Sequence, residues 1–178
     1  PEVARGRAHL QIGRLLASRT EPAEIGGRAF EIVNQLNRGS HLITSPDERT
    51  QVAGLNLIAG RRARLSTAYA SAIEYLTVGR ALLTEGDWKH NYELIFGIEY
   101  QLAECELLTA STAAAEQRLS MLAERTENRV RLEVVDERVG IHEDGRACRD
   151  VIKSHGLSSG PTSGSRAARS SSTELSGD

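Results

Sequence analysis

A short basic run, "GRRAR" from Gly60 to Arg64, holds the side chains best suited to binding chemistry. The guanidinium groups of Arg61, Arg62 and Arg64 could bind phosphate or an acidic surface of a partner protein. Runs of this kind also occur at solvated corners between helices, where the arginine stems cover apolar surface. These arginines are therefore a candidate basic interaction surface, and a solvated corner is the favoured alternative.

Three aromatic residues extend this candidate surface: Tyr69, Trp88 and Tyr92. Aromatic and arginine side chains contribute most of the binding energy at many interfaces, so these residues could bind a peptide together with the arginines. For Trp88 the favoured alternative is packing between neighbouring helical hairpins.

The nucleotide-binding and zinc motifs of common enzymes are absent from the sequence. A P-loop requires a glycine-rich turn followed by lysine and a hydroxyl residue, and the chain contains no Gly-Lys pair. A protein-kinase catalytic loop and the zinc motif HExxH are absent as well. We therefore expect no catalytic, cofactor-binding or metal-binding residue in this chain.

Isolated polar residues give weaker signals. Glu104 and Glu106 are two positions apart, so on a helix they point to different faces, and no ExxH motif accompanies them. They are predicted to be structural or solvated. Cys105 and Cys148 lack the CxxC spacing, so we expect buried free thiols rather than a disulfide or a zinc site. His142, in "IHEDG", has the acidic neighbour of a phosphoacceptor histidine, but no ATP-binding half follows, and an exposed loop histidine is predicted.

Composition disfavours several classes of partner. The 178 residues include 22 basic and 24 acidic ones, a formal net charge of -2 that gives no overall field to attract nucleic acid or an anionic membrane. No apolar run approaches the roughly 20 residues of a membrane span, and the N-terminus lacks the apolar core of a signal peptide. We expect a cytoplasmic protein, and the first residue, Pro1, suggests a processed chain or a fragment.

Apolar residues recur at helical spacing through the first 125 positions, which predicts an all-α fold. The connections are short, so successive helices should form antiparallel hairpins. The stretch "NRVRLEVVDERVG" also fits a period of two and is assigned to a helix from its context. The predicted inward residues are Ala8, Ile12, Leu15 and Leu16; Ile25, Ala29, Ile32, Val33 and Leu36; Val52, Leu55 and Ala59; Leu65, Ala68, Tyr69, Ala72, Tyr75 and Leu76; Ile95, Ile98, Leu102 and Cys105; and Ala115, Leu119 and Leu122.

Start and stop signals divide these helices. In "SPDE" we expect a capping box, in which Ser45 accepts a hydrogen bond from the Glu48 N–H and the Glu48 carboxylate returns one. Gly60 and Gly86 are predicted to end helices, as is Gly39. Asp87 is predicted to cap the helix that follows it.

A helical hairpin is predicted to occur twice. In Leu102–Leu122 the small corner residue Ala110 precedes the inward residues, as Gly60 precedes Tyr69. A weaker third copy has Gly145, 35 positions after Ala110, close to the tetratricopeptide period of about 34 residues. The first two corners are 50 positions apart, so the array is irregular and an ordinary antiparallel bundle is the alternative.

Five stretches carry a resemblance to a known family: "HLQIGRLL", "FEIVNQLNRG", "LNLIAGRRARLSTAYASAIEYLTVGRALL", "DWKHNYEL" and "ECELLTA". Together they resemble the helical, tetratricopeptide-like segment that follows the P-loop ATPase module of large bacterial signalling proteins. Those proteins join a serine/threonine kinase-like domain, the ATPase, this segment, a GAF sensor and a sensor histidine kinase. The resemblance extends from about His9 to Leu122 and faintly to about Leu157, and it departs at Ala110, where the family usually has glycine.

The resemblance implies a non-catalytic interaction and regulatory segment that couples a nucleotide-binding module to sensor and kinase modules. ATP and Mg²⁺ would then bind other domains of a parent ATP-dependent protein kinase, and the partners would be neighbouring domains or another protein. The alternative is a stand-alone tetratricopeptide-like adaptor that binds a peptide on a concave face lined by Tyr69, Tyr92 and neighbouring arginines.

The domain organisation predicted from these patterns has two parts. Residues 1–157 should form the repeat-like α-solenoid domain, best defined over 45–123 and eroded over 124–157. Residues 158–178 hold eight Ser and three Gly against a single Leu, too little apolar surface to offset the entropy of ordering, and are predicted to be a disordered tail.

Overall fold

The computed structural model describes residues 2–139, with the side chains of residues 2–130. These residues form six α-helices and two short 3-10 helices, without a strand among them, which confirms the predicted all-α class. The predictions for His142, Gly145, Cys148 and the tail lie outside the described residues. The elements are α1 (Glu2–Ser18), α2 (Ile25–Asn37), η1 (Ser40–Leu42), α3 (Pro46–Leu65), α4 (Tyr69–Ala81), η2 (Glu85–Lys89), α5 (Tyr92–Leu108) and α6 (Thr112–Val139).

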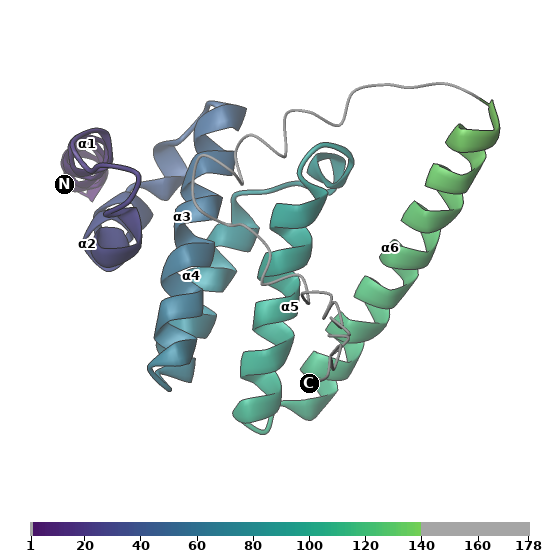
Figure 1. Cartoon of the computed structure of the whole chain (residues 1–178). Coiled ribbons are helices and arrows are strands. Elements are labelled where there is room, and N and C mark those ends of the chain that lie inside the picture. Colours follow the sequence, from purple (N-terminus) through teal and green to yellow (C-terminus); the bar gives the residue numbers. More distant parts are fainter. Residues whose placement is uncertain (1, 140–178) are drawn as a thin grey trace, which may run out of the picture.

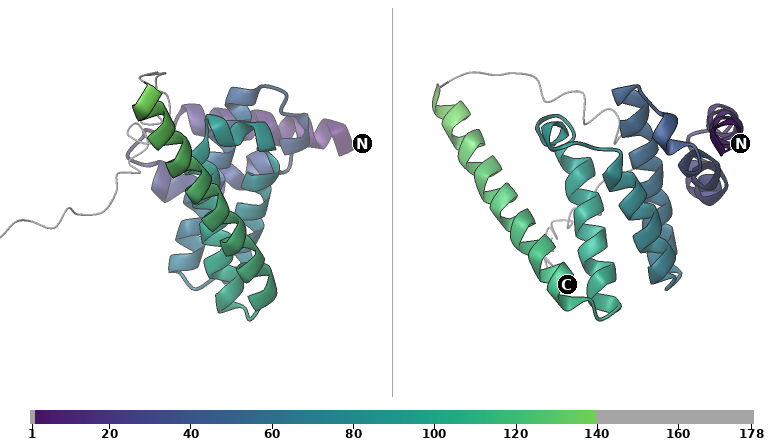
Figure 2. Two further views of the ribbon diagram at one scale, coloured as in Figure 1. Left: turned by 90° about the vertical axis from the view of Figure 1, so that its right-hand side faces the viewer. Right: turned by 180° about the vertical axis from the view of Figure 1, so that it is seen from behind.

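The helices follow one another across the molecule in the order of the sequence. In Figure 1, α1 and α2 are seen nearly end-on at one side, α3, α4 and α5 stand upright, and α6 lies at the other side. Each α-helix contacts the next one along the chain, and α3 also contacts α5. Figure 2 shows the same succession from behind. The arrangement therefore places α1 and α6 at opposite ends of the array.

The turns from α3 to α4 and from α5 to α6 have the same structure. In each turn, the N–H of one residue donates to the carbonyl of the residue five positions earlier. The N–H of the residue just before it donates to a carbonyl three positions earlier. These two bonds form the Schellman pattern. Thr67 and Ala110 occupy the left-handed position, both with φ of 60°. The predicted corner at Ala110 is confirmed. The prediction of a corner at Gly60 is wrong, because α3 continues to Leu65. The residue that corresponds to Ala110 is Thr67, 43 positions earlier.

Gly60 lies inside α3, at the point where α4 comes so close that a side chain would not fit. A Cβ at Gly60 would lie 2.5 Å from Leu76 Cγ, whereas a Cβ at Gly54 would have no atom within 4 Å. Leu76 is fully buried in the main core, which spans α3 to α6. The buried members of this core are Ala53, Leu57, Ala63, Ala72, Leu76, Leu83, Trp88, Ile95, Ile98, Leu102, Cys105 and Leu122.

The predicted inward face of the first helix is wrong. Three of its members are exposed: Ala8, Ile12 and Leu15. The buried face, which packs on α2 and on the segment from Arg38 to Leu42, instead consists of Gly6, Leu10 and Gly13. A Cβ at Gly13 would lie 2.9 Å from the backbone nitrogen of Leu36. Apolar periodicity misses such a face because the close approach of two helices needs residues without side chains.

Most other predicted inward residues are buried or half-buried. The exceptions are Leu65, Ala68 and Leu119, which are exposed. Leu65 and Ala68 flank the turn between α3 and α4, where the side chains have no neighbouring helix to cover them. The stretch that fits two periods is helical as far as it is described, because α6 extends to Val139.

The start of α3 is formed largely as predicted. Pro46 is the first helical residue, and the Ser45 hydroxyl accepts a hydrogen bond of 3.4 Å from the Glu48 N–H. The Glu48 carboxylate, predicted to return this bond, instead accepts two hydrogen bonds from Arg14 of α1. The side chain thus joins two helices rather than closing a capping box.

The predicted stop at Gly86 and cap at Asp87 are wrong, because both residues lie in η2 between α4 and α5. The Asp87 carboxylate accepts hydrogen bonds from the N–H and the hydroxyl of Thr84, at 2.6 and 2.8 Å. These bonds, the backbone one most, hold the pKa of the Asp87 carboxyl below its usual value. The capping box of this chain therefore closes a 3-10 helix, not α5.

Candidate interaction surface

The arginines of the basic run turn toward two different neighbours. Arg62 reaches α2, where its guanidinium lies 5.8 Å from the centroid of the Phe30 ring. Arg64 reaches α5, where its Nε donates a 2.8 Å hydrogen bond to Gln101 and lies 3.7 Å from the Glu104 carboxylate. The run therefore links α3 to α2 and α5, and its side chains do not share one patch.

Arg61 is half-buried between α3 and α5. A Cβ at Gly97 of α5 would lie 3.4 Å from its terminal nitrogen, so this glycine makes room for the guanidinium. Burial lowers the pKa of the Arg61 guanidinium, and the nearby charge of Arg64 lowers it further. Arginine nevertheless stays protonated at neutral pH, so a positive charge is held here with limited access to water.

Trp88 of η2 and Tyr92, the first residue of α5, lie next to each other, and both contact α6. Trp88 is only 6 % exposed, and its ring meets that of Tyr92 edge-on with 5.5 Å between centroids. The guanidinium carbon of Arg125 lies 5.0 Å from the centroid of the Trp88 ring, and that of Arg129 lies 4.2 Å from the centroid of the Tyr92 ring. Trp88 thus packs in the core between α5 and α6.

Tyr69 lies at the beginning of α4, half-buried against the main core. The three aromatic residues of the predicted surface therefore occupy two separate places, with Tyr69 beside the turn after α3 and the other two near η2. Their role as an interaction surface stays a prediction.

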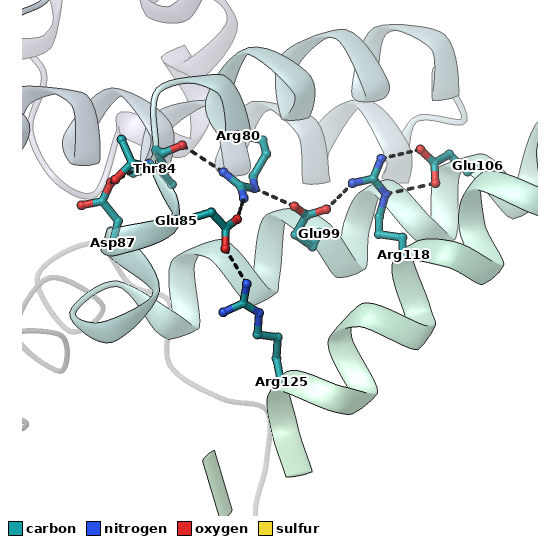
Figure 3. A network of polar contacts seen from close by, with 9 residues as sticks. Arg80, Thr84, Glu85, Asp87, Glu99, Glu106, Arg118 and Arg125 are labelled. Carbon is teal, nitrogen blue, oxygen red and sulfur yellow. Dashed lines mark hydrogen bonds and ion pairs between the residues drawn. The ribbon is translucent and has the colours of Figure 1, made fainter. Parts of the chain in front are cut away.

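A chain of charged side chains joins α4, α5 and α6, as Figure 3 shows. At its centre is Glu99 of α5, whose side chain is 5 % exposed. Glu99 accepts a 2.6 Å hydrogen bond from Arg80 of α4 and a further hydrogen bond from Arg118 of α6. Arg118 also donates two hydrogen bonds, of 3.1 and 2.8 Å, to Glu106. Two guanidinium groups thus neutralise one buried carboxylate.

The chain of charges continues at the surface. Arg80 donates a 3.0 Å hydrogen bond to Glu85 of η2, and Arg125 of α6 donates to the second oxygen of the same carboxylate. Burial disfavours the charge on Arg118, but hydrogen bonds to Glu106 and Glu99 outweigh it and raise the pKa of this guanidinium. The two glutamates therefore stabilise the charged form of Arg118, which holds α6 to α5.

One feature of the sequence indicates this network, although the spacing of apolar residues alone does not reveal it. The inward face of α6 combines two apolar residues, Ala115 and Leu122, with three arginines, Arg118, Arg125 and Arg129. The prediction that Glu104 and Glu106 are structural and point to different faces is confirmed, since they bind α3 and α6 respectively. Glu99 and Arg118 were not among the predicted residues.

A groove of about 390 Å³ lies between α1, α2 and α3. Its rim includes the pair of Arg14 and Glu48, joined by hydrogen bonds of 2.7 and 2.8 Å. The apolar lining includes Ala17, Ile25, Leu36, Val52, Leu55 and Ile58. The groove is lined by none of the residues of the predicted interaction surface.

The described residues form neither a cluster of metal ligands nor a membrane-spanning helix. Within residues 2–130, no three or more side chains of His, Cys, Asp and Glu lie in a group that could hold a metal ion. Cys105 is a buried free thiol, as predicted, and burial raises its pKa. No helix in the described part of the chain has the length and apolar content needed to cross a membrane.

Comparisons with known proteins give one informative similarity. The chain is 28 % identical over 120 residues to the hybrid signal transduction histidine kinase G of Dictyostelium discoideum. The similar region covers 62 % of this chain, and it spans 3 % of the length of that kinase. No protein-family model matches the chain, and no solved structure matches it. The chain is therefore similar to a small part of a signal-transduction kinase.

Proposed function

We propose that this chain is a non-catalytic helical segment of a signalling histidine kinase, a tetratricopeptide-like array that couples a nucleotide-binding module to sensor and kinase modules. The observation that carries the proposal is the similarity over 120 residues to part of a hybrid signal transduction histidine kinase. Since the chain spans 3 % of that protein, the kinase activity belongs to other domains in this proposal. ATP and Mg²⁺ are bound there as well.

The contacts between helices support a role in coupling. Glu99 and Arg118 join α4, α5 and α6 through buried charges, and Gly60 lets Leu76 pack directly on α3. Such contacts make neighbouring helices move together, because separation would leave a buried charge unpaired or open the core. A change in docking at one end of the array then biases the module at the other end.

The arrangement of charged residues supports a non-catalytic role. The most buried carboxylates, Glu99 and Glu106, are engaged by arginines of other helices. A catalytic acid or base instead needs an open position within hydrogen-bond reach of the substrate. In the proposed function these glutamates serve helix packing.

A stand-alone peptide-binding adaptor is the second candidate. The groove between α1, α2 and α3, of about 390 Å³ and with an apolar lining, favours it. The two candidates differ in the effect of separation from a kinase. A stand-alone adaptor binds its peptide as an isolated chain, whereas the coupling segment acts through the domains attached to it.

The test is the kinase output of the complete gene product with and without residues 2–139. Autophosphorylation is measured from labelled ATP in the presence and absence of the activating signal. The proposed function predicts that removal of the segment uncouples output from the signal while ATP binding is retained. An output and a signal response equal to those of the intact protein would exclude the coupling role.

A further inference from the structure

The outward side of α1 carries an apolar stripe that no other described element covers. It consists of Ala4, Ala8, Ile12 and Leu15, spaced so that all four lie on one face of the helix. All four are exposed, Ile12 to 47 % and Leu15 to 50 %. We call this stripe the outer face of α1. It lies opposite the face that packs on α2.

The outer face is a second apolar stripe on α1. A surface helix normally has one apolar stripe, which faces the core, and polar residues elsewhere, so an exposed second stripe indicates a contact surface. The principal contacts of α1 are with α2 and η1. In Figure 1, α1 lies together with α2 at one edge of the array. The position leaves room for another helix alongside.

Charge restricts what that helix can be. Three exposed arginines lie near the outer face, Arg5 and Arg7 on α1 and Arg19 directly after its last residue, and Glu2 is the acidic residue of α1. The fourth arginine, Arg14, is engaged by Glu48. A second copy of α1 would bring arginines against arginines, which is unfavourable, whereas carboxylates on a partner would form charge-assisted hydrogen bonds with them.

We propose that the outer face of α1 docks an amphipathic α-helix of a partner domain whose apolar stripe is flanked by aspartate or glutamate. Ala4 and Ala8 permit close approach of the two backbones, and Ile12 and Leu15 fill the grooves of the docked helix. A membrane surface fits less well, because interfacial helices carry Trp, Phe and Leu, and the outer face has one Leu and no aromatic residue.

The docking is tested in cells by photo-crosslinking, with the complete gene product carrying p-benzoylphenylalanine in place of Ala8. The matched control replaces Ala70, an exposed alanine of α4, in the same way. Crosslinked peptides are identified by mass spectrometry. The proposal predicts a crosslink from position 8, absent from position 70, to a helical segment with an apolar stripe and acidic flanks. The double variant R5E/R19E should lower its yield about tenfold, because like charges then face each other.

Several outcomes would overturn the proposal. These are a yield at position 8 no higher than at position 70, or a crosslink to lipid, to a second copy of the chain, to residues 140–178, or to a helix without acidic flanks. The inference deepens the proposed function and rests on it for the existence of an attached partner domain. If removal of residues 2–139 changes kinase output but position 8 crosslinks to none of the expected helices, the inference fails and the proposed function stands.

Discussion

Asn37 of α2 and Asn56 of α3 exchange two side-chain hydrogen bonds, of 2.8 and 2.9 Å. Asn56 is fully buried, and its amide also donates a 2.9 Å hydrogen bond to the Val52 carbonyl. A satisfied polar pair of this kind fixes the register of two helices, since sliding would leave buried donors and acceptors unpaired. The pair therefore ties the α1–α2 end of the array to its main core.

Replacement of Asn56 by leucine tests this link. The variant leaves Asn37 without its partner in a partly buried position, so the free energy of unfolding should fall by about 1–3 kcal/mol. The double variant N37L/N56L removes both polar groups and should recover most of the loss. Urea denaturation followed by far-UV circular dichroism measures both. A single variant as stable as the wild type would show that the pair does not stabilise the fold.

Gly60 and Gly54 give a matched comparison on one helix. Alanine at Gly60 should destabilise the chain by about 1–3 kcal/mol, because its Cβ would lie 2.5 Å from Leu76 Cγ. Alanine at Gly54 meets no atom within 4 Å and should stabilise the chain by about 0.5–1 kcal/mol through higher helix propensity. Thermal unfolding of the two variants provides the measurement. Equal shifts in the same direction would contradict the close approach of α3 and α4.

Glu99 should be the costliest carboxylate to remove. Glu99→Ala leaves two arginines partly buried without their shared partner, so the free energy of unfolding should fall by about 3 kcal/mol, near the lower end expected for buried pairs. The control is Glu93→Ala, whose half-exposed pair with Arg129 should contribute about 0–1 kcal/mol. Urea denaturation at neutral pH distinguishes them, and similar losses would argue against a buried network.

The Asp87 carboxyl provides a prediction for pH. Its pKa is lowered in the folded state, so the bonds from Thr84 stabilise the fold above the unfolded value of about 3.9. That contribution is lost as the pH falls through the folded-state pKa. The stability difference between wild type and Asp87→Asn should therefore narrow from about pH 6 to about pH 3. A carbon-13 NMR titration should show a depressed pKa, partly restored in Thr84→Val, and a normal wild-type pKa would contradict the contact.

The fold class and most helix faces could be predicted from the sequence because aliphatic residues such as Ile32, Leu76 and Ile98 mark the core with helical spacing. Ser45 and Pro46 marked the start of α3 for a similar reason, since capping depends on adjacent residues alone. Structural features that depend only on residues close together in the sequence could thus be predicted.

Structural features that depend on contacts between helices could not be predicted from the sequence. Gly60 looks like a helix stop in the sequence, and only the position of Leu76 shows that it is a packing site. Thr67 has no sequence signal for a left-handed turn, because non-glycine residues are uncommon there. The partners of Arg61 and Arg64 on α5 likewise follow from the arrangement of helices in space.

The central claim is that kinase output passes through the packing of this array, and one comparison of variants tests it most directly. Autophosphorylation of the complete gene product is measured for Gly60→Ala and Gly54→Ala, with ATP binding as a control for the other domains. The account predicts that Gly60→Ala changes the signal-dependent output about fivefold or more, since coupling free energies commonly amount to about 1–3 kcal/mol, and that Gly54→Ala leaves it unchanged. Equal output from both variants and the wild type, with Gly60→Ala destabilised as expected, would contradict the claim.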